Sequence, residues 1–262
     1  MEFRTVLYSV RNGVAEIVMN QPQALNPMND ESMDEMLAAL GLCAADDGVK
    51  TVIIRGAGRA FCGGGDIKYF KQELEKPGFG LGPLVGKVGR VVTAIRALPK
   101  PVICAVHGAA AGGGCNLVFA CDIAIAADNA KFIEAFVNIG LAPDTGGCFT
   151  LPRLIGQARA FELMSTGRVM KAEEALSLGL ISQVCPSEEL LARAYELADK
   201  YAAGPSRAYA KLKEMINASM YSGLGEYLEL EERSLDELSK TDDFKEGISA
   251  FLEKRPAVYQ GK

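Results

Sequence analysis

The sequence has no tryptophan and only one histidine in 262 residues. It also has no C-x-x-C pair, and its seven cysteines lie mostly in apolar or tightly turned segments. An odd number of cysteines without paired spacing argues against a zinc or disulfide framework, and one histidine leaves a cysteine nucleophile little choice of basic partner. We therefore expect no metal site, and we expect the cysteines to be small buried hydrophobic residues in a reducing cytoplasm.

Long apolar runs and a strong net charge are missing as well. No run approaches the length of a bilayer span, so we expect no membrane partner. The strand-like pattern that begins at Met1–Thr5 leaves no room for a signal peptide, and we therefore expect a cytoplasmic protein. The formal net charge of −5 argues against a nucleic-acid surface. A chain of this length can bury one large core, or a core with a helical appendage.

The segment from Lys100 to Gly147 organises the chain. Its run Val102–Val106 is short, apolar and partly β-branched, which favours an interior parallel strand. The following turn, Gly108–Gly114, is built from glycine and alanine, and a helix is predicted to start near Gly113. Other atoms must approach the bare backbone of this turn closely. A helix N-terminus there offers unpaired N–H groups to a negative or polarised oxygen.

A second run has the same character. Thr51–Arg55 reads as a strand, Gly56–Gly65 as a glycine-rich turn and Asp66–Leu74 as a helix with Asp66 as its N-cap. For either turn alone, close packing of a helix on its strand is the simplest interpretation. Two such turns in one domain suit a pair of backbone donors that converge on one oxygen. Neither turn spells G-x-G-x-x-G, which argues against a dinucleotide-binding domain.

Outside these turns the pattern predicts strands and helices in alternation, and hence an α/β fold. Thr5–Val10 and Val14–Asn20 alternate around Arg11–Gly13, which is typical of a β-hairpin. Asp30–Ala44 shows helical spacing, with Asp30 as the N-cap. Lys76–Pro83 is rich in glycine and proline, and it is either a lid or a slack connection.

The end of the chain is predicted to be helical throughout. Besides the strand at Val102–Val106 and the helix near Gly113, the predicted elements after Pro83 are a helix at 84–98, strands at 123–126 and 131–133, and helices at 188–202, 206–220, 225–238 and 242–252. In the helix at 225–238 the apolar residues leave a charged face that includes Glu231. Such a helical end either packs on its own core or serves as an interface.

Several segments, in order along nearly the whole chain, resemble the crotonase (enoyl-CoA hydratase/isomerase) superfamily. They are Arg59–Ile67, Lys100–Gly108, Ala111–Asn116 with Cys121–Ala127, Gly140–Gly147 and Glu246–Lys254. The resemblance implies a spiral of ββα units over residues 1–195, which contains the CoA and acyl site. It also implies a C-terminal helical region, residues 196–262, that forms trimers, and trimers of this family pair into hexamers.

The resemblance further implies an acyl-CoA substrate, with coenzyme A as part of the substrate thioester and no separate cofactor. By motif position, the N–H groups of Gly65 and Gly113 form the oxyanion hole for a thioester enolate. The backbone around Gly64, Asp66, Ile67 and Lys68 is expected to bind the CoA moiety. Lys68 and Lys254 are expected near its phosphates, the latter from the same or a neighbouring subunit.

The proton carriers distinguish this chain from hydratases that resemble it. The two glutamates of those hydratases fall on Asn116 and Phe136, neither of which can carry a proton, and we expect both residues to line the acyl site. Related dienoyl-CoA isomerases have a third acid, which falls on Asp144. A single carboxylate suits a 1,3-proton shift, because it can remove a proton and return it two carbons away. Apolar neighbours of Asp144 are expected to raise its pKa.

Three residues have a plainer interpretation. Asp144 can also be read as the N-cap of the next helix. Glu134 is expected to be a helix-start or surface glutamate, or to line the acyl pocket. His107, the only histidine, is expected to hold backbone carbonyls rather than to act in catalysis.

The segment Ala130–Gly147 looks most like isomerases of the phenylacetate pathway, which act on 1,2-epoxyphenylacetyl-CoA, with Δ3,Δ2-enoyl-CoA isomerases close by. Our hypothesis is therefore an acyl-CoA double-bond isomerase with Asp144 as its only acid/base. The alternatives are a hydratase that recruits Glu134, and a hydrolase or dehalogenase with Asp144 as nucleophile. A non-catalytic CoA-binding scaffold or an RNA-binding relative is a further class, but the mixed charges of Asp66–Glu75 do not form a phosphate track.

Overall fold

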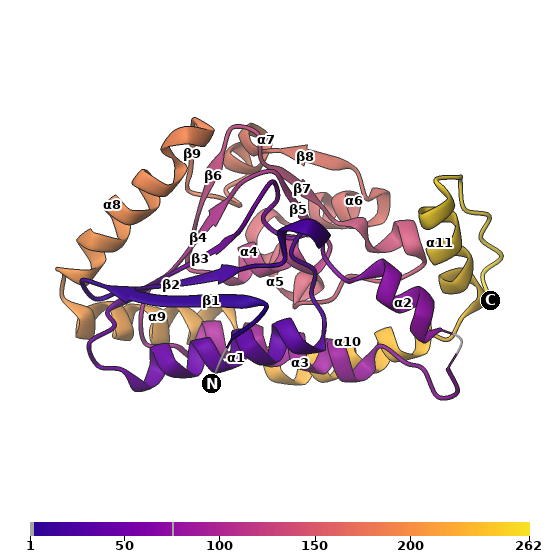
Figure 1. Cartoon of the computed structure of the whole chain (residues 1–262), viewed down its shortest axis with the longest axis horizontal. Helices are drawn as coiled ribbons and strands as arrows, with labels where there is room; N and C mark the ends of the chain where they lie inside the picture. Colours follow the sequence, from indigo (N-terminus) through magenta and orange to yellow (C-terminus); the bar gives the residue numbers. More distant parts are fainter. Residues whose placement is uncertain (1–2, 75) are drawn as a thin grey trace.

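A six-stranded sheet lies at the centre of the computed structural model, which describes residues 3–74 and 76–262 (Figure 1). The strand order is β1 (Val6–Arg11), β2 (Val14–Met19), β3 (Thr51–Gly56), β4 (Val102–Val106), β6 (Ile123–Ala127) and β9 (Gln183–Cys185). β1 and β2 form the predicted antiparallel hairpin, and every other neighbouring pair is parallel. All residues of β4 are buried, so the prediction of an interior parallel strand is confirmed.

A second, three-stranded sheet consists of β5 (Ala109–Ala111), β7 (Lys131–Ile133) and β8 (Val169–Lys171). The turn predicted at 108–114 contains a short strand that was not predicted, because three of its alanines form β5 and pair in parallel with β7. Small side chains permit this close pairing, and Ala110 is fully buried opposite Phe132. β8 and β9, of three residues each, were not predicted, whereas the equally short β7 was.

Two layers of helices cover the large sheet. α1 (Asp30–Ala45) and α3 (Gly82–Ala97) contribute to the larger core on one face, and α8 (Leu190–Ala202) packs on Ile53, Ile103 and Ile125 on the other. The N-cap of α1 is Asn29 and not the predicted Asp30, because the Asn29 side chain and Ser32 form a reciprocal capping box.

The two glycine turns lead into α2 (Ile67–Glu73) and α4 (Gly113–Ala120), as predicted. Asp66 is the N-cap of α2, since its carboxylate accepts a 3.0 Å hydrogen bond from Tyr69 N–H. α5 (Gly147–Ile155), α6 (Gln157–Thr166) and α7 (Ala172–Ser177) follow, with short 3-10 turns η1 (Pro22–Ala24), η2 (Ala135–Ile139) and η3 (Ser187–Glu189).

The predicted helical end consists of α8, α9 (Ser206–Met220), α10 (Leu224–Leu238) and α11 (Asp242–Glu253). α10 packs along α3, where Gly89 allows Leu228 to approach, and α11 lies against α2 and η2 (Figure 1). Part of the segment at 76–83 is docked on this end: Phe79 stacks on Phe244, and Leu81 N–H donates to Ser239 Oγ. Among the described residues, no helix combines the length and the apolarity that a membrane crossing requires.

Candidate active site

The two glycine turns meet in the fold. Cys62 N–H donates to Ala109 O at 3.1 Å, and Ala111 N–H donates to Cys62 O at 2.9 Å, so the first turn runs beside β5. Gly64 has a φ of +87°, and a Cβ on it would lie 2.8 Å from the carbonyl oxygen of Ala111. The turns therefore need glycine at this contact, for conformation and for space.

Gly65 and Gly113 have free N–H groups at this junction. Among the residues that the structure describes, neither N–H donates to a protein acceptor. Gly113 is the first residue of α4, where a helix leaves its N–H groups unpaired and carries a partial positive charge. The two unpaired backbone donors that the sequence predicts are therefore present in the structure. Their role in an oxyanion hole stays a prediction.

Asp144 lies beside Gly113. A Cβ on Gly113 would lie 3.0 Å from Asp144 Oδ1 and 2.7 Å from Thr145 Oγ1, so only glycine fits there. Burial raises the pKa of Asp144 to about 6, and a 2.6 Å hydrogen bond donated by Thr145 Oγ1 opposes that shift. A carboxyl with such a pKa is ionised at neutral pH and still basic enough to accept a proton.

Asp144 does not cap α5 through its side chain. The N-cap residue of α5 is Gly146, which has no side chain that could form a capping hydrogen bond. Gly147 N–H donates to the backbone carbonyl of Asp144 at 3.0 Å, which leaves the carboxylate free of a capping role. The N-cap interpretation of Asp144 is therefore wrong.

Asn116 and Phe136 both lie at this site. Asn116 Nδ2 donates to the backbone carbonyl of Asp144 at 2.9 Å and to Glu134 Oε2 at 3.3 Å. Phe136 is buried, and its ring lies 3.7 Å from the position of a Cβ on Gly112. The structure therefore brings both residues to the glycine turns, one beside Asp144 and the other against the second turn.

Glu134 is only 4% exposed, so its interpretation as a surface glutamate is wrong. It does stand at a helix start, because it is the N-cap residue of η2, but its side chain forms no capping hydrogen bond. Burial raises the pKa of Glu134 to about 8. Hydrogen bonds from Cys115 and Asn116 oppose this rise, and the charge of Asp144 adds to it. Its Oε1 and the Oδ1 of Asn116 have no hydrogen-bond partner among the described residues.

The residues expected to bind CoA lie on or beside α2. The carboxylate of Asp66 is used by the cap of α2, Ile67 is half-buried, and Lys68 is exposed. Lys254 is exposed at the end of α11, the helix that packs against α2. Neither Lys68 nor Lys254 forms an ion pair within the described part of the chain, and their role at a phosphate stays a prediction.

His107 holds a backbone carbonyl, as expected. Its Nε2–H donates to the carbonyl oxygen of Gly58 at 2.8 Å, which ties the end of β4 to the first glycine turn. Residues 3–74 and 76–262 contain no group of three acidic, cysteine or histidine side chains arranged to hold a metal ion.

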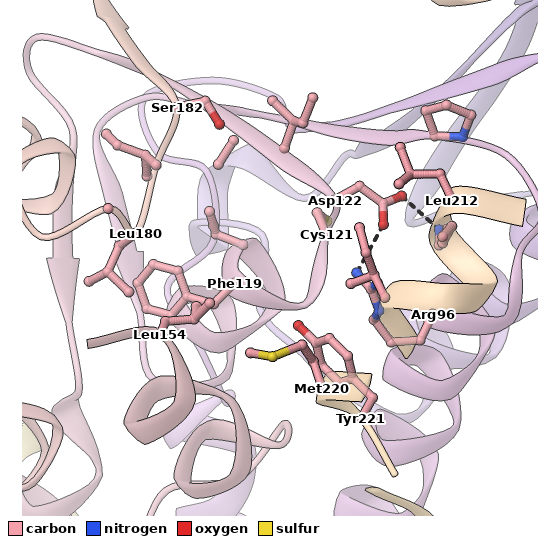
Figure 2. Close-up of a pocket in the computed structure, with 18 of the residues that line it drawn as sticks. Arg96, Phe119, Cys121, Asp122, Leu154, Leu180, Ser182, Leu212, Met220 and Tyr221 are labelled. Atoms are coloured by element: carbon pink, nitrogen blue, oxygen red, sulfur yellow. Dashed lines mark hydrogen bonds and ion pairs between the residues drawn. The ribbon is translucent and has the colours of Figure 1, made fainter. Parts of the chain in front are cut away.

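A cavity of about 330 Å³ lies elsewhere, between β6, α4 and α9 (Figure 2). Its polar wall is a buried ion network in which Asp122 pairs with Arg96 at 2.9 Å and with Lys213 at 2.7 Å. Lys213 Nζ also donates to two backbone carbonyls, which fills its three donor positions. The cavity contains neither Asp144 nor a residue of the glycine turns, so we assign it no part in the chemistry.

Sequence reasoning missed Glu231. It was expected on the charged face of its helix, but the residue is 3% exposed and accepts hydrogen bonds from Gly146 N–H. No local signal marks this role, because Glu231 and its neighbour Glu232 look alike in sequence and only the packing of α10 buries the former.

Comparisons with known proteins identify the family. The family described as Enoyl-CoA hydratase/isomerase matches residues 9–262. The chain is 38% identical to trans-2-decenoyl-(acyl-carrier-protein) isomerase of Streptococcus mutans and 39% identical to 1,2-epoxyphenylacetyl-CoA isomerase of Escherichia coli, with 100% of each chain covered. It is 37% identical to a probable enoyl-CoA hydratase of Rhodobacter capsulatus, again over 100% of both chains. A crystal structure of an enoyl-CoA hydratase from Mycobacterium avium subsp. paratuberculosis matches with a TM-score of 0.91 and 32% identity, over 99% of this chain and 100% of that one.

Proposed function

The chain belongs to the enoyl-CoA hydratase/isomerase family of the crotonase superfamily, and we propose that it is an acyl-CoA double-bond isomerase with Asp144 as its proton carrier. The observation that carries this proposal is the position of Asp144 Oδ1, 3.0 Å from where a Cβ on Gly113 would lie. The carboxylate and the unpaired N–H at the start of α4 thus lie side by side, which supports a role for both at one substrate. The side chains of Asn116 and Phe136, which lie nearby, cannot carry a proton.

The first step is removal of a proton beside the thioester carbonyl or its conjugated double bond. The electron pair of the broken C–H bond moves toward the carbonyl, which becomes an enolate oxygen. The N–H groups of Gly65 and Gly113 stabilise this oxygen, and single backbone donors of this kind lower a barrier by about 2.7–4 kcal/mol.

The second step returns the same proton to the carbon two positions away. Asp144 is suited to both steps, because its pKa of about 6 lets it accept and release a proton near neutral pH. Phe136, Ile139 and Leu141 precede Asp144 in the chain and are buried, which supports a site from which water is excluded. Atoms balance without water, and the product is an isomer of the substrate.

The substrate we propose is an unsaturated acyl-CoA thioester, either an open-chain 3-enoyl group or a ring. Names of the relatives support both, since one is an isomerase of a decenoyl chain on acyl carrier protein and one acts on an epoxyphenylacetyl ring on CoA. A panel of 2-enoyl, 3-enoyl and ring-unsaturated CoA thioesters, with matched acyl-carrier-protein thioesters, would identify the acyl group and its carrier. A place in phenylacetate catabolism stays a prediction that the ring substrates test.

Replacing Asp144 by Asn tests the proposal. The amide keeps the shape of the side chain but cannot accept the proton, so we expect 3-enoyl-CoA conversion to fall by about 100-fold or more. Asp47→Asn, at an exposed position, is the matched control and should leave conversion unchanged. Undiminished turnover in a folded Asp144→Asn variant would rule out the role.

A hydratase that uses Glu134 is the second candidate. It is favoured by the burial of Glu134 next to Asn116 and by the free Oε1 of this carboxyl, which offers a second acid at the site. Hydratase names among the relatives support it as well. Conversion in ¹⁸O-labelled water separates the two functions, because a hydratase places the label in the product and an isomerase does not.

We also propose that the C-terminal region assembles the chain into a trimer, or a hexamer of two trimers. α9 supports this proposal, because Leu212, Met215 and Ile216 on it are 56%, 69% and 43% exposed and form an apolar face that a second copy can cover. Light scattering of the wild type and of Met215→Glu tests it, and a wild-type monomer would refute it. A cytoplasmic location is proposed as well, since the seven cysteines are all free thiols.

A further inference from the structure

Glu231 of α10 reaches the loop that carries Asp144. Both of its carboxylate oxygens lie 3.1 Å from Gly146 N, whose N–H donates to them. Glu231 is buried, and 85 residues separate it from Gly146 in the chain. A carboxyl group from the C-terminal helices therefore contacts the backbone two residues after the proposed proton carrier.

The backbone at this contact is unusual. Thr145 has a φ of +60° and Gly146 a φ of +73°, so two consecutive residues are left-handed. A β-branched residue rarely adopts that conformation, and it persists only where surrounding contacts enforce it. Gly147 N–H donates to Asp144 O at 3.0 Å and closes a turn across these two residues. The N–H of Gly146, the second of them, donates to both carboxylate oxygens of Glu231.

The conformation of Thr145 also places its hydroxyl. Oγ1 donates to Asp144 Oδ1 at 2.6 Å, and the same oxygen lies 2.7 Å from where a Cβ on Gly113 would be. A change in the left-handed turn would move this hydroxyl away from Asp144 and alter the space beside Gly113. The contact at Glu231 is thus linked to the carboxylate through one residue.

We propose that Glu231 is a positioning residue for Asp144, acting as the acceptor that keeps Thr145 and Gly146 left-handed and so directs the Thr145 hydroxyl to the Asp144 carboxylate. The inference rests on the proposed function, because it assigns Glu231 to the same proton-transfer site.

The groups around Glu231 favour its neutral form, so its role as an acceptor does not require a charge. They are Asp144 on the loop, Tyr227 on its own helix and Cys148 on α5. Burial, and then the charge of Asp144, raises the pKa of Glu231 to about 8, while the hydrogen bonds from Gly146, Tyr227 and Thr145 oppose the rise. At neutral pH Asp144 is thus ionised and Glu231 largely neutral, so a glutamine can supply the same carbonyl oxygen to the turn.

The test compares Glu231→Leu, which removes the acceptor, with Glu231→Gln, which keeps one. We expect kcat of the leucine variant on 3-enoyl-CoA to fall about 10- to 100-fold with little change in KM, since small misplacements of a catalytic group have effects of this size. The acid limb of its pH–rate profile should move to higher pH, because loss of the Thr145 hydrogen bond removes the interaction that lowers the pKa of Asp144.

Glu231→Gln should stay within about threefold of the wild type and keep its acid limb, and Glu229→Gln, at an exposed position of the same helix, should match the wild type. A leucine variant that loses stability while its acid limb stays in place would overturn the positioning role. Equal losses in the leucine and glutamine variants would also overturn it.

Amide hydrogen exchange of the peptide that spans residues 144–149 provides a readout without substrate. The leucine variant should exchange faster there than the wild type, and the two glutamine variants should not. A wild-type chain without isomerase activity would refute the proposed function, yet the exchange result would still decide whether Glu231 holds the turn. Unchanged exchange in Glu231→Leu would overturn the inference.

Discussion

The hydroxyl of Thr145 donates a 2.6 Å hydrogen bond to Asp144 Oδ1 while its own backbone is left-handed at φ +60°. Within the described part of the chain, it is the one side-chain hydrogen bond that lowers the pKa of Asp144 against the effect of burial. A local backbone conformation therefore helps to set the acidity of the proposed proton carrier. The relationship can be tested by substitutions that change the hydroxyl but keep the shape.

Thr145→Val should raise the pKa of Asp144 above about 6, because it removes a hydrogen bond to the ionised carboxylate. Activity requires ionised Asp144, so the rate at acidic pH should fall and the acid limb of kcat should move to higher pH. Thr145→Ser keeps the hydroxyl and is the matched control, for which the limb should stay in place. Activity at acidic pH that is equal in both variants would contradict this account of the Asp144 pKa.

Gly113→Ala should abolish most activity. Its Cβ would lie 2.7 Å from Met28 Sδ and 2.7 Å from Thr145 Oγ1, so side chains around the proposed oxyanion site must shift. We expect a loss of at least about 100-fold in kcat, in line with the removal of one oxyanion donor.

The control for this substitution is Gly41→Ala in α1, where a Cβ meets nothing within 4 Å. That change should leave activity unaltered and stabilise the fold by up to about 1 kcal/mol, because alanine is the better helix former. Steady-state kinetics and thermal unfolding of both variants make the comparison. An active Gly113→Ala variant would argue against a backbone donor at this position.

Glu134→Gln should become more stable relative to the wild type as the pH rises. The folded-state pKa of Glu134 is raised to about 8 from an ordinary value of 4.5, chiefly by burial. The folded state therefore favours neutral Glu134. The stability that this gives is complete below about pH 4.5 and is lost as the pH rises toward 8. A neutral amide at this position does not titrate.

Urea unfolding at several pH values measures this difference. The gap in unfolding free energy between Glu134→Gln and the wild type should grow by a few kcal/mol over that pH window, while Asp47→Asn should show no such trend. A gap that does not change with pH would show that Glu134 titrates normally. If the isomerase proposal holds, Glu134→Gln should also retain 3-enoyl-CoA conversion at neutral pH.

The glycine turns were predictable because each is a chain-local signal. Glycines between an apolar strand and a helix indicate that other atoms approach the backbone closely. The structure shows such a contact between Gly64 and the carbonyl oxygen of Ala111. The C-terminal helices were predictable for the same reason, since their spacing repeats over twelve or more residues. Family resemblance added the register that picked out Asp144 from the other carboxylates.

The burial of Glu134 and Glu231 was not predictable from the sequence. Each lies in a segment whose local pattern suits an exposed charge, and each becomes buried only when distant elements pack: β7 beside β5 for the former, and α10 beside α3 for the latter. The left-handed turn at Thr145 was equally hidden, because threonine gives no sign of a positive φ. Such features depend on tertiary contacts that override local preference.

Asp122→Ala should destabilise the fold strongly without changing the chemistry. Asp122 pairs with Arg96 and Lys213, both buried, so its removal leaves two cations without their carboxylate. Breaking a buried pair in this way costs about 3–5 kcal/mol, and the cost follows from the unpaired charges and not from the pair itself. Asp128→Ala, an exposed site with one hydrogen bond from Ser187, should cost less than about 1 kcal/mol.

The ion network of Asp122 lines a cavity that does not contain Asp144 (Figure 2). The kcat of the folded fraction of Asp122→Ala, measured below the unfolding transition, should therefore equal that of the wild type. A lowered kcat in folded Asp122→Ala would link the cavity to the reaction and contradict its purely structural role.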